Sequence, residues 1–334
     1  MLSSAPRKPH IVAALVFLCL CLLAAPALAA PEQPGYYRIV LLADPHLPFR
    51  AAHAADPGRQ NKIIAAKNKL VEDINAWQDV GEIVVLGDIA ASRGTADEYA
   101  YAVAYFAKFR APRVFITGNH DYLYLDEPDR NGRSVRGDAA ARADKLRRFK
   151  ETFGLPELYH AQKVGDYLLI FLSVDALDSP CLAQLSDRQL KWLDGELKKD
   201  PAAPTIIFCH APLAGTLAQY NKSVNTPNFV VQPEQPLAGI IAANPQILLW
   251  VSGHTHTPAD NPSFAAAVNQ FAGRVTNIHN TDLDREGIWT NSLYLYADKV
   301  IVKTFNHKKG AWVNELERIF PLPRQLSDNN SGNM

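Results

Sequence analysis

The sequence predicts an α/β protein built around a parallel sheet. Between residues 37 and 117, short apolar segments typical of buried strands alternate with segments of helical period, a pattern typical of strand–helix–strand units. Each of the three apolar segments leads directly into polar residues. Parallel strands gather their carboxyl ends at one edge of a sheet, which is where ligands bind in such folds. We therefore expect a polar site at that edge.

The elements of the first part follow from composition and periodicity. We predict strands at 37–42, 83–86 and 114–117 and helices at 60–77 and 98–109. The first strand contains the β-branched pair Ile39 and Val40, and the first helix places Ile63, Leu70 and Ile74 on one face. Residues 122–144 are mostly polar and are predicted to form a loop, which lies either over the mouth of the site or on the surface without a substrate role.

The second part continues the same alternation. Ser186 is predicted to cap a helix that runs through Leu197. The remaining predicted elements are a helix at 145–153 and strands at 167–174, 205–210, 247–253, 275–279, 292–297 and 300–305, with Asp298 and Lys299 in the turn of a terminal hairpin.

The N-terminal segment has the pattern of a secretory signal. Arg7 and Lys8 precede an apolar run from Ile11 to Leu23, and Ala27-Leu28-Ala29 supplies small residues for cleavage. We predict a signal peptide at 1–30, one catalytic domain at 31–324 and a disordered tail at 325–334. The expected location is periplasmic or secreted, with no membrane span after cleavage. The alternative is an uncleaved N-terminal anchor.

The charge of the chain argues against a broad nucleic-acid-binding surface. Two of the 34 Lys and Arg residues and none of the 34 acidic residues lie in the first thirty positions. The rest of the chain therefore has 32 bases against 34 acids, a formal net charge of −2. A nearly neutral chain has no electrostatic footprint for a polyanion, so we expect no stable nucleic-acid partner.

Five short motifs carry the ligand-type residues, and each follows an apolar run. They are Asp44-Pro45-His46, Gly87-Asp88, Gly118-Asn119-His120-Asp121, His210 and Gly253-His254-Thr255-His256. Alone, an Asp-x-His triplet or a Gly-Asp pair is common in proteins without a metal. In an extended strand, residues two apart face the same way, which would direct Asp44 and His46 at one ion and would repeat at His254 and His256.

Taken in order, these motifs resemble those of the calcineurin-like metallophosphoesterases over residues 37 to about 305. The resemblance implies a four-layer αββα sandwich with two mixed β-sheets flanked by helices. It also implies two divalent or mixed-valence metal ions. Ligands made only of carboxylate, amide and imidazole groups suit Mn, Fe, Zn or Co. One ion would be held by Asp44, His46, Asp88 and His256, and the other by Asp88, Asn119, His210 and His254.

The same resemblance assigns His120 to the substrate. Asp121, grouped with His120 as catalytic, is expected to hold a ring or loop in place behind the ligands. His120 would protonate the leaving oxygen or stabilise the transition state, and a metal-activated hydroxide would attack phosphorus. One departure from the family concerns position 91, where many members have an Asp or Asn that steadies this histidine. Here it is Ala91, and either Ser92 or Asp121 would have to replace it. His53 and His279 lie outside the motifs and are interpreted as surface or packing residues.

The predicted function is an exported, dinuclear-metal-dependent phosphoesterase that hydrolyses phosphodiester or phosphomonoester bonds. Its expected partner is a small phosphate ester, and a nucleotide is one candidate. Tyr122 and Tyr124 are interpreted either as loop anchors or as stacking surfaces for a base. The alternative from another class is a non-catalytic metal-binding or scaffold member of the family. A nuclease is a lesser alternative, which the neutral charge disfavours.

Overall fold

A computed structural model describes residues 35–322 of the chain. The predicted signal peptide at 1–30 and the predicted tail at 325–334 lie outside the described residues, so both stay predictions. Within the described part, no helix combines the length and the apolar character that crossing a membrane requires.

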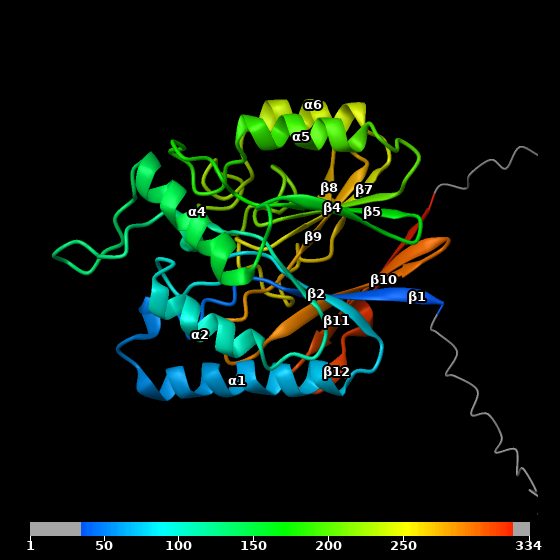
Figure 1. The fold of residues 1–334 in the computed structure, drawn as a ribbon. Coiled ribbons are helices and arrows are strands. Elements are labelled where there is room, and N and C mark those ends of the chain that lie inside the picture. Colours follow the sequence, from blue (N-terminus) through cyan, green and yellow to red (C-terminus); the bar gives the residue numbers. More distant parts are fainter. Residues whose placement is uncertain (1–34, 323–334) are drawn as a thin grey trace, which may run out of the picture. The chain divides into compact units, whose positions relative to one another are not determined.

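The strands form two mixed sheets, as predicted (Figure 1). The seven-stranded sheet has the order β12-β11-β10-β1-β2-β3, with β13 also paired to β11. Its strands are β1 (Tyr36–Leu42), β2 (Val80–Val85), β3 (Arg113–Phe115), β10 (Trp289–Tyr296), β11 (Lys299–Asn306), β12 (Ala311–Trp312) and β13 (Arg318–Pro321). The six-stranded sheet has the order β4-β5-β6-β7-β9-β8. Its strands are β4 (His160–Val164), β5 (Tyr167–Leu172), β6 (Thr205–Cys209), β7 (Ile247–Ser252), β8 (Gln270–Phe271) and β9 (Val275–His279).

Helices cover the outer face of each sheet, which completes the four predicted layers (Figure 1). The helices are α1 (Pro57–Ala76), α2 (Ala96–Phe106), α3 (Asn119–Tyr122), α4 (Ala139–Phe153), α5 (Asp187–Leu197) and α6 (Glu234–Ala243), with 3-10 turns at Ala51–His53, Ala267–Asn269 and Asn314–Leu316. In the figure, α1 and α2 lie against the seven-stranded sheet, and α5 and α6 lie against the six-stranded sheet.

Local sequence signals explain where the long helices begin and end. Ser186 caps α5 as predicted, because its side chain accepts a hydrogen bond from the backbone of Gln189. Thr95 and Glu98 form a reciprocal capping box at the start of α2. Helix α4 begins earlier than predicted, since Asp138 caps it, and it ends at Gly154, whose φ of 64° favours glycine.

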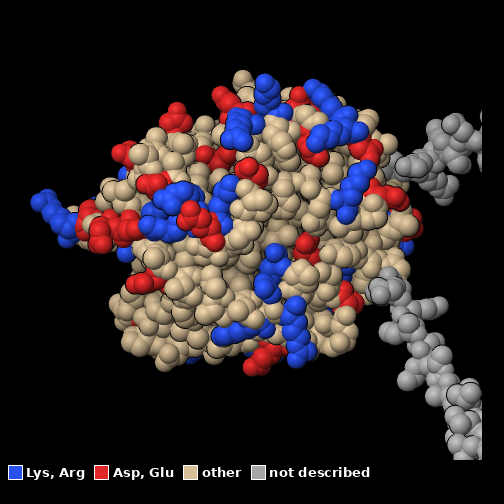
Figure 2. Space-filling model, viewed as in Figure 1, with Lys and Arg blue, Asp and Glu red and all other residues tan. Residues whose placement is uncertain are grey.

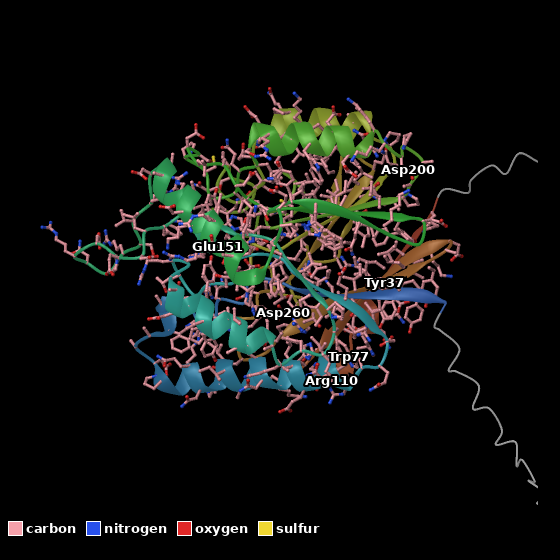
Figure 3. All side chains as sticks on the ribbon, in the orientation of Figure 1. Tyr37, Trp77, Arg110, Glu151, Asp200 and Asp260 are labelled. Carbon is pink, nitrogen blue, oxygen red and sulfur yellow. The ribbon has the colours of Figure 1, made fainter. Side chains whose placement is uncertain are left out.

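Three clusters of buried apolar side chains fill the spaces between the layers. One lies between the sheets and includes Ile39, Val84, Phe208 and Val251. The other two lie between each sheet and its helices. Figure 3 shows side chains filling these spaces, and Tyr37, which is labelled there, packs against the cluster between the sheets. The core therefore fixes the positions of the carboxyl ends of the parallel strands in both sheets.

Most strong apolar segments were predicted correctly, and the weak ones were missed. Strand β9 has the predicted bounds, and β5, β6, β7, β10 and β11 differ from their predictions by a few residues. The edge strands β4 and β13 were not predicted, because polar residues such as Gln162 and Arg318 interrupt their apolar pattern. Helix α6 was also missed, since Pro236 and Gly239 weaken its helical signal.

Candidate metal centre

The five motifs converge at the carboxyl ends of parallel strands. Strands β1, β2 and β3 are parallel neighbours in one sheet, and β6 and β7 are parallel neighbours in the other. Each motif follows one of these five strands directly or after a short turn. The predicted ligands therefore come from both sheets and meet where the two edges face each other.

Four predicted ligands form a first cluster. Ligand atoms of Asp44, His46, Asp88 and His256 all lie within 4.8 Å of one another. His46 Nε2 lies 3.2 Å from His256 Nε2, and His256 Nε2 lies 3.3 Å from an Asp44 oxygen. Separations of this size are expected for donor atoms that each lie about 2.0–2.2 Å from one ion.

A second cluster shares Asp88 with the first. Ligand atoms of Asp88, His210 and His254 also lie within 4.8 Å of one another. His210 Nε2 lies 3.5 Å from Asp88 Oδ1 and 3.3 Å from Asn119 Oδ1, which brings the amide oxygen into this cluster. The structure thus gathers all seven predicted ligands into two groups joined by one carboxylate. Their role as metal ligands stays a prediction.

The hydrogen bonds and the pKa values of the histidines suit the binding of two divalent ions. His210 Nδ1 donates to the Leu86 carbonyl at 2.8 Å and His254 Nε2 donates to the Asn228 carbonyl at 2.8 Å. These bonds leave the opposite ring nitrogen of each neutral histidine with a free lone pair that can bind a metal. Burial lowers the pKa of His46 well below its usual value and that of His254 to about 4. Both rings are therefore neutral at pH 7, which is the form that binds metal.

The backbone at the ligands explains how they converge. Asp44, His46, Asp88, His254 and His256 all have φ between 41° and 65°, a region that non-glycine residues seldom occupy. Strand β1 ends at Leu42 and β7 at Ser252, so the ligand pairs do not lie on extended strands. Asp44 and His46 do lie in one cluster, but the predicted cause, the alternation of side chains along a strand, was wrong for both pairs. The side chains are aimed by left-handed turns, and His254 and His256 reach different clusters.

His120 lies beside the clusters and is oriented by the backbone. Its Nδ1 donates to the Ser92 carbonyl at 2.7 Å, and its ring packs edge-on against His46 at 5.0 Å between centroids. The expected carboxylate or amide partner is absent at Ala91, and the Ser92 carbonyl supplies the contact instead. Since Nδ1 carries the proton in this bond, Nε2 is the nitrogen that remains for a substrate.

Asp121 is buried behind the site and does not line the cavity at its mouth. Its carboxylate accepts backbone hydrogen bonds from Ile89 and Ala90 at 3.0 Å and from Gly118 at 2.8 Å. These bonds tie the loop after β2 to the loop after β3. Asp121 is therefore a positioning residue rather than one that contacts substrate.

A cavity of about 250 Å³ opens above the clusters. It is lined by Arg50, Asp88, Asn119, His120, Tyr124, Leu182, Phe229, His254, Thr255 and His256. Tyr124 lies next to His120, and Phe229 stacks on His254 with 5.2 Å between centroids. Tyr122 is fully buried and donates to the Ala176 carbonyl, so it is the anchor and only Tyr124 reaches the cavity. The rest of the predicted loop contributes no lining residue.

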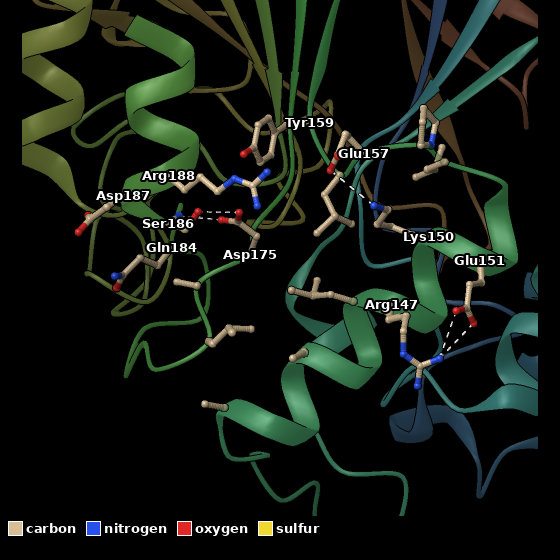
Figure 4. Close-up of a pocket in the computed structure, with 18 of the residues that line it drawn as sticks. Arg147, Lys150, Glu151, Glu157, Tyr159, Asp175, Gln184, Ser186, Asp187 and Arg188 are labelled. Carbon is tan, nitrogen blue, oxygen red and sulfur yellow. Dashed lines mark hydrogen bonds and ion pairs between the residues drawn. The ribbon is translucent and has the colours of Figure 1, made fainter. Parts of the chain in front are cut away.

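A larger hollow lies elsewhere, between α4 and α5 (Figure 4). Its volume is about 1160 Å³, and its charged lining residues include Arg147, Glu157, Asp175 and Arg188. Figure 4 shows Asp175 bonded to Ser186 and Lys150 directed at Glu157. It contains none of the predicted ligands, so size alone does not identify the reactive site.

Sequence reasoning missed a buried charge network next to the first cluster. The fully buried Asp284 carboxylate contacts Arg50, Lys67 and His53. Lys67 also donates to the carbonyls of His46 and Pro48, which ties α1 to the loop that carries a ligand. His53, interpreted from the sequence as a surface or packing residue, is a buried member of this network. A lysine on the apolar face of a predicted helix was the available signal.

Comparisons with known proteins agree with this geometry. A family model described as calcineurin-like phosphoesterase matches residues 37–258. A 3',5'-cyclic-nucleotide phosphodiesterase of Nostoc sp. is 25% identical over 265 residues, which span 76% of this chain and 82% of that protein.

Two solved structures share the fold at low sequence identity. A dimetal phosphatase from Danio rerio has a TM-score of 0.55 at 13% identity, over 85% of this chain and 98% of that one. A purple acid phosphatase from yellow lupin (Lupinus luteus) has a TM-score of 0.57 at 13% identity, over 86% of this chain and 54% of that one. At this identity the likeness concerns the fold, and it agrees with the four-layer arrangement predicted from the sequence.

Proposed function

We propose that this chain, which belongs to the calcineurin-like phosphoesterase family and is a metal-dependent phosphoester hydrolase, hydrolyses small phosphodiesters. We also propose that it is exported. The observation that carries the first proposal is the pair of ligand clusters that share Asp88 beneath a cavity of about 250 Å³. A cavity of this size suits a small ester better than a polymer. The similarity to a phosphodiesterase of Nostoc sp. supports the preference for diesters and makes a nucleotide one candidate.

The reaction divides between the expected ions and the residues of the chain. When bound, two ions would neutralise charge on the phosphoryl oxygens and supply an activated water as nucleophile. Asp88 would serve both ions, with Asp44, His46 and His256 on one side and Asn119, His210 and His254 on the other. The turns that carry these residues fix the ligands before a substrate arrives.

His120 is the residue proposed to move a proton. Its Nδ1–H is committed to the Ser92 carbonyl, so only the cationic ring carries a second proton, on Nε2. We infer that this proton passes to the leaving oxygen as the bond to phosphorus breaks, which general acid catalysis requires. The Ser92 contact keeps the ring from turning away from the cavity.

The cavity wall favours an organic ester group with an apolar face. Tyr124, Leu182 and Phe229 form this wall, and no Lys or Arg apart from Arg50 lines the described cavity. On the face shown in Figure 2, acidic and basic side chains are interspersed rather than gathered into one basic patch. Both observations support a small ester over a long nucleic acid.

The test is hydrolysis of a chromogenic bis-aryl phosphodiester and of the matching aryl monoester by the purified protein with added Mn²⁺. We expect turnover of both, faster for the diester, and its loss after chelation. A 3',5'-cyclic nucleotide and a long single-stranded DNA then distinguish a small-ester enzyme from a nuclease. Turnover of neither aryl ester by protein with bound metal would favour a non-catalytic metal-binding member of the family.

Export is proposed from the signal-like segment alone. A fusion of residues 1–30 to a reporter enzyme that is active only outside the cytoplasm should show reporter activity. The same fusion with Arg7 and Lys8 replaced by Glu should give much less, because a positive start is part of the targeting pattern. Equal activity from a leaderless reporter would refute export.

A further inference from the structure

We propose that Arg50 contacts a phosphoryl oxygen of the substrate and sets the affinity of the site for phosphate esters. This inference rests on the proposed phosphoesterase function and adds a residue that none of the five motifs contains. The phosphate group itself, rather than the organic part of the ester, is the chemistry that Arg50 would recognise.

The position of Arg50 places its charge at the site. Its side chain lines the same cavity as Asp88, His120 and His256. Its Nη1 lies 3.0 Å from Nδ1 of His256, whose other ring nitrogen belongs to the first ligand cluster. The side chain is 32% exposed, whereas the Lys67 side chain nearby is 2% exposed and donates to backbone carbonyls. Arg50 is therefore the cation of this network that an incoming anion meets.

Buried carboxylates hold the guanidinium in one orientation. Nε donates to Asp284 Oδ2 at 2.8 Å, and Nη2 lies 3.7 Å from Asp282 Oδ2. Asp284 is itself fixed, because it also contacts Lys67 at 3.2 Å and His53 at 2.9 Å. Nη1, which lies beside His256, and Nη2 carry two N–H groups each, so each terminal nitrogen keeps a donor that could meet a phosphate oxygen from a fixed direction.

The charge balance of the cavity also favours an anion at Arg50. The carboxylates of Asp44 and Asp88 belong to the ligand clusters, where the expected ions would neutralise them. Tyr124, Leu182 and Phe229 add apolar lining, and among the described residues that line the cavity Arg50 is the one with a permanent positive charge. A phosphate ester above the clusters would therefore meet the charged donor Arg50 at its phosphoryl oxygens. His120 is assigned to the leaving oxygen instead.

The simplest competing role is that Arg50 only steadies His256. A pure steadying role predicts weaker metal binding after substitution, with phosphate affinity per loaded site unchanged. A phosphate-contacting role predicts weaker phosphate affinity per loaded site, with metal binding unchanged. The two roles are separated by measuring metal content and phosphate affinity in the same samples.

The experiment is calorimetric titration of inorganic phosphate into Mn²⁺-loaded wild type, Arg50→Gln and Arg50→Lys, with metal content measured in each. A charge-assisted hydrogen bond is lost in Arg50→Gln, so its Kd for phosphate should rise about 10- to 100-fold with metal content unchanged. Arg50→Lys keeps a charge but loses the guanidinium, and its Kd should fall between the two. Lys62→Gln is the matched control, because Lys62 is an exposed cation on α1 paired with Glu286 outside the cavity, and its Kd should equal that of wild type.

The outcomes separate this inference from the proposed function. An unchanged phosphate Kd in Arg50→Gln, or a rise fully explained by lost metal, would overturn the role of Arg50. Should Arg50→Gln fail to fold, a wild-type Kd in Arg50→Lys would overturn it equally, since only the guanidinium has gone. Phosphate binding that depends on Arg50 without turnover of any ester would uphold this inference and refute the hydrolytic proposal.

Discussion

Five of the predicted metal ligands have a left-handed backbone conformation. Asp44, His46, Asp88, His254 and His256 are not glycines, yet all have positive φ. Such conformations cost about 1–3 kcal/mol each and persist where the surrounding structure imposes them. Here hydrogen bonds hold them in place, since the Asp44 carboxylate accepts from the His254 backbone at 2.8 Å. The strain is located at the positions where carboxylates and imidazoles must converge.

Replacing His120 with Ala should lower turnover by about 10²–10⁴-fold, as loss of a general acid typically does. Metal content should stay at the wild-type level, because His120 belongs to neither ligand cluster. The loss should be smaller for aryl esters with good leaving groups, which need little protonation. Steady-state rates across a series of leaving groups check this. Equal losses across the series would instead assign His120 to stabilising charge on the phosphoryl group.

The sequence identified the chemistry of individual residues better than their geometry. All seven predicted ligands meet, because side-chain type and motif order can be read directly from the sequence. The backbone conformation that brings them together was predicted wrongly, since left-handed turns at Asp44 and His254 leave no local sequence signal comparable to glycine. Arg50 was missed because its side chain is held at the site by Asp284, which lies 234 positions away in the sequence.

Two glycines in the loops after the strands allow the ligand carboxylates to approach the backbone. A Cβ added at Gly253 would lie 2.3 Å from Asp44 Oδ2, and one added at Gly118 would lie 2.3 Å from both the backbone nitrogen and Oδ1 of Asp88. These distances are shorter than any non-bonded contact, so the carboxylates would have to move. The close approach therefore explains why both motifs begin with glycine.

We predict that Gly253→Ala and Gly118→Ala each displace a ligand carboxylate, weaken metal binding and destabilise the protein by about 1–3 kcal/mol. Metal titration and chemical denaturation measure the two effects. Gly195→Ala is the matched control, since it lies in α5 with no atom near the added Cβ, and it should stabilise by about 0.5–1 kcal/mol. Wild-type metal affinity in both loop variants would show that the carboxylates are not constrained by these glycines.

Element prediction succeeded where burial is strong and failed where it is weak. Strand β5 is buried along its whole length and was found from its apolar run. Strands β4 and β13 lie at sheet edges, where one side faces solvent and polar residues are tolerated. The four-layer order itself came from the family resemblance, because alternation of strands and helices does not reveal that the chain divides into two sheets.

The interior between the layers also contains buried polar residues, and one of them makes stability depend on pH. His279, at the end of β9, is fully buried and donates through Nε2 to the Thr216 carbonyl at 2.9 Å. Burial lowers the pKa of His279 to about 3, with the charge of Arg318 acting in the same direction. In the unfolded chain the same side chain titrates near 6.5.

We therefore predict that the free energy of unfolding falls as pH decreases below about 6.5. In that range the unfolded chain binds a proton at His279 that the folded chain excludes, so this contribution is complete above pH 6.5 and declines toward pH 3, by up to about 1.4 kcal/mol per pH unit. Denaturant titrations of wild type and His279→Gln between pH 7.5 and 4.5 give the difference that isolates this residue. Parallel pH profiles for the two proteins would show that His279 does not contribute.

The shared carboxylate makes metal stoichiometry the decisive quantity for the protein. Elemental analysis of Mn²⁺-loaded wild type should approach two ions per chain, because two clusters of ligand atoms meet at Asp88. Asp88→Asn should lose more metal than Asp44→Asn, since Asp44 belongs to one cluster and Asp88 to both. A firm plateau at one ion per chain in wild type, or near-native metal content in Asp88→Asn, would contradict the dinuclear site.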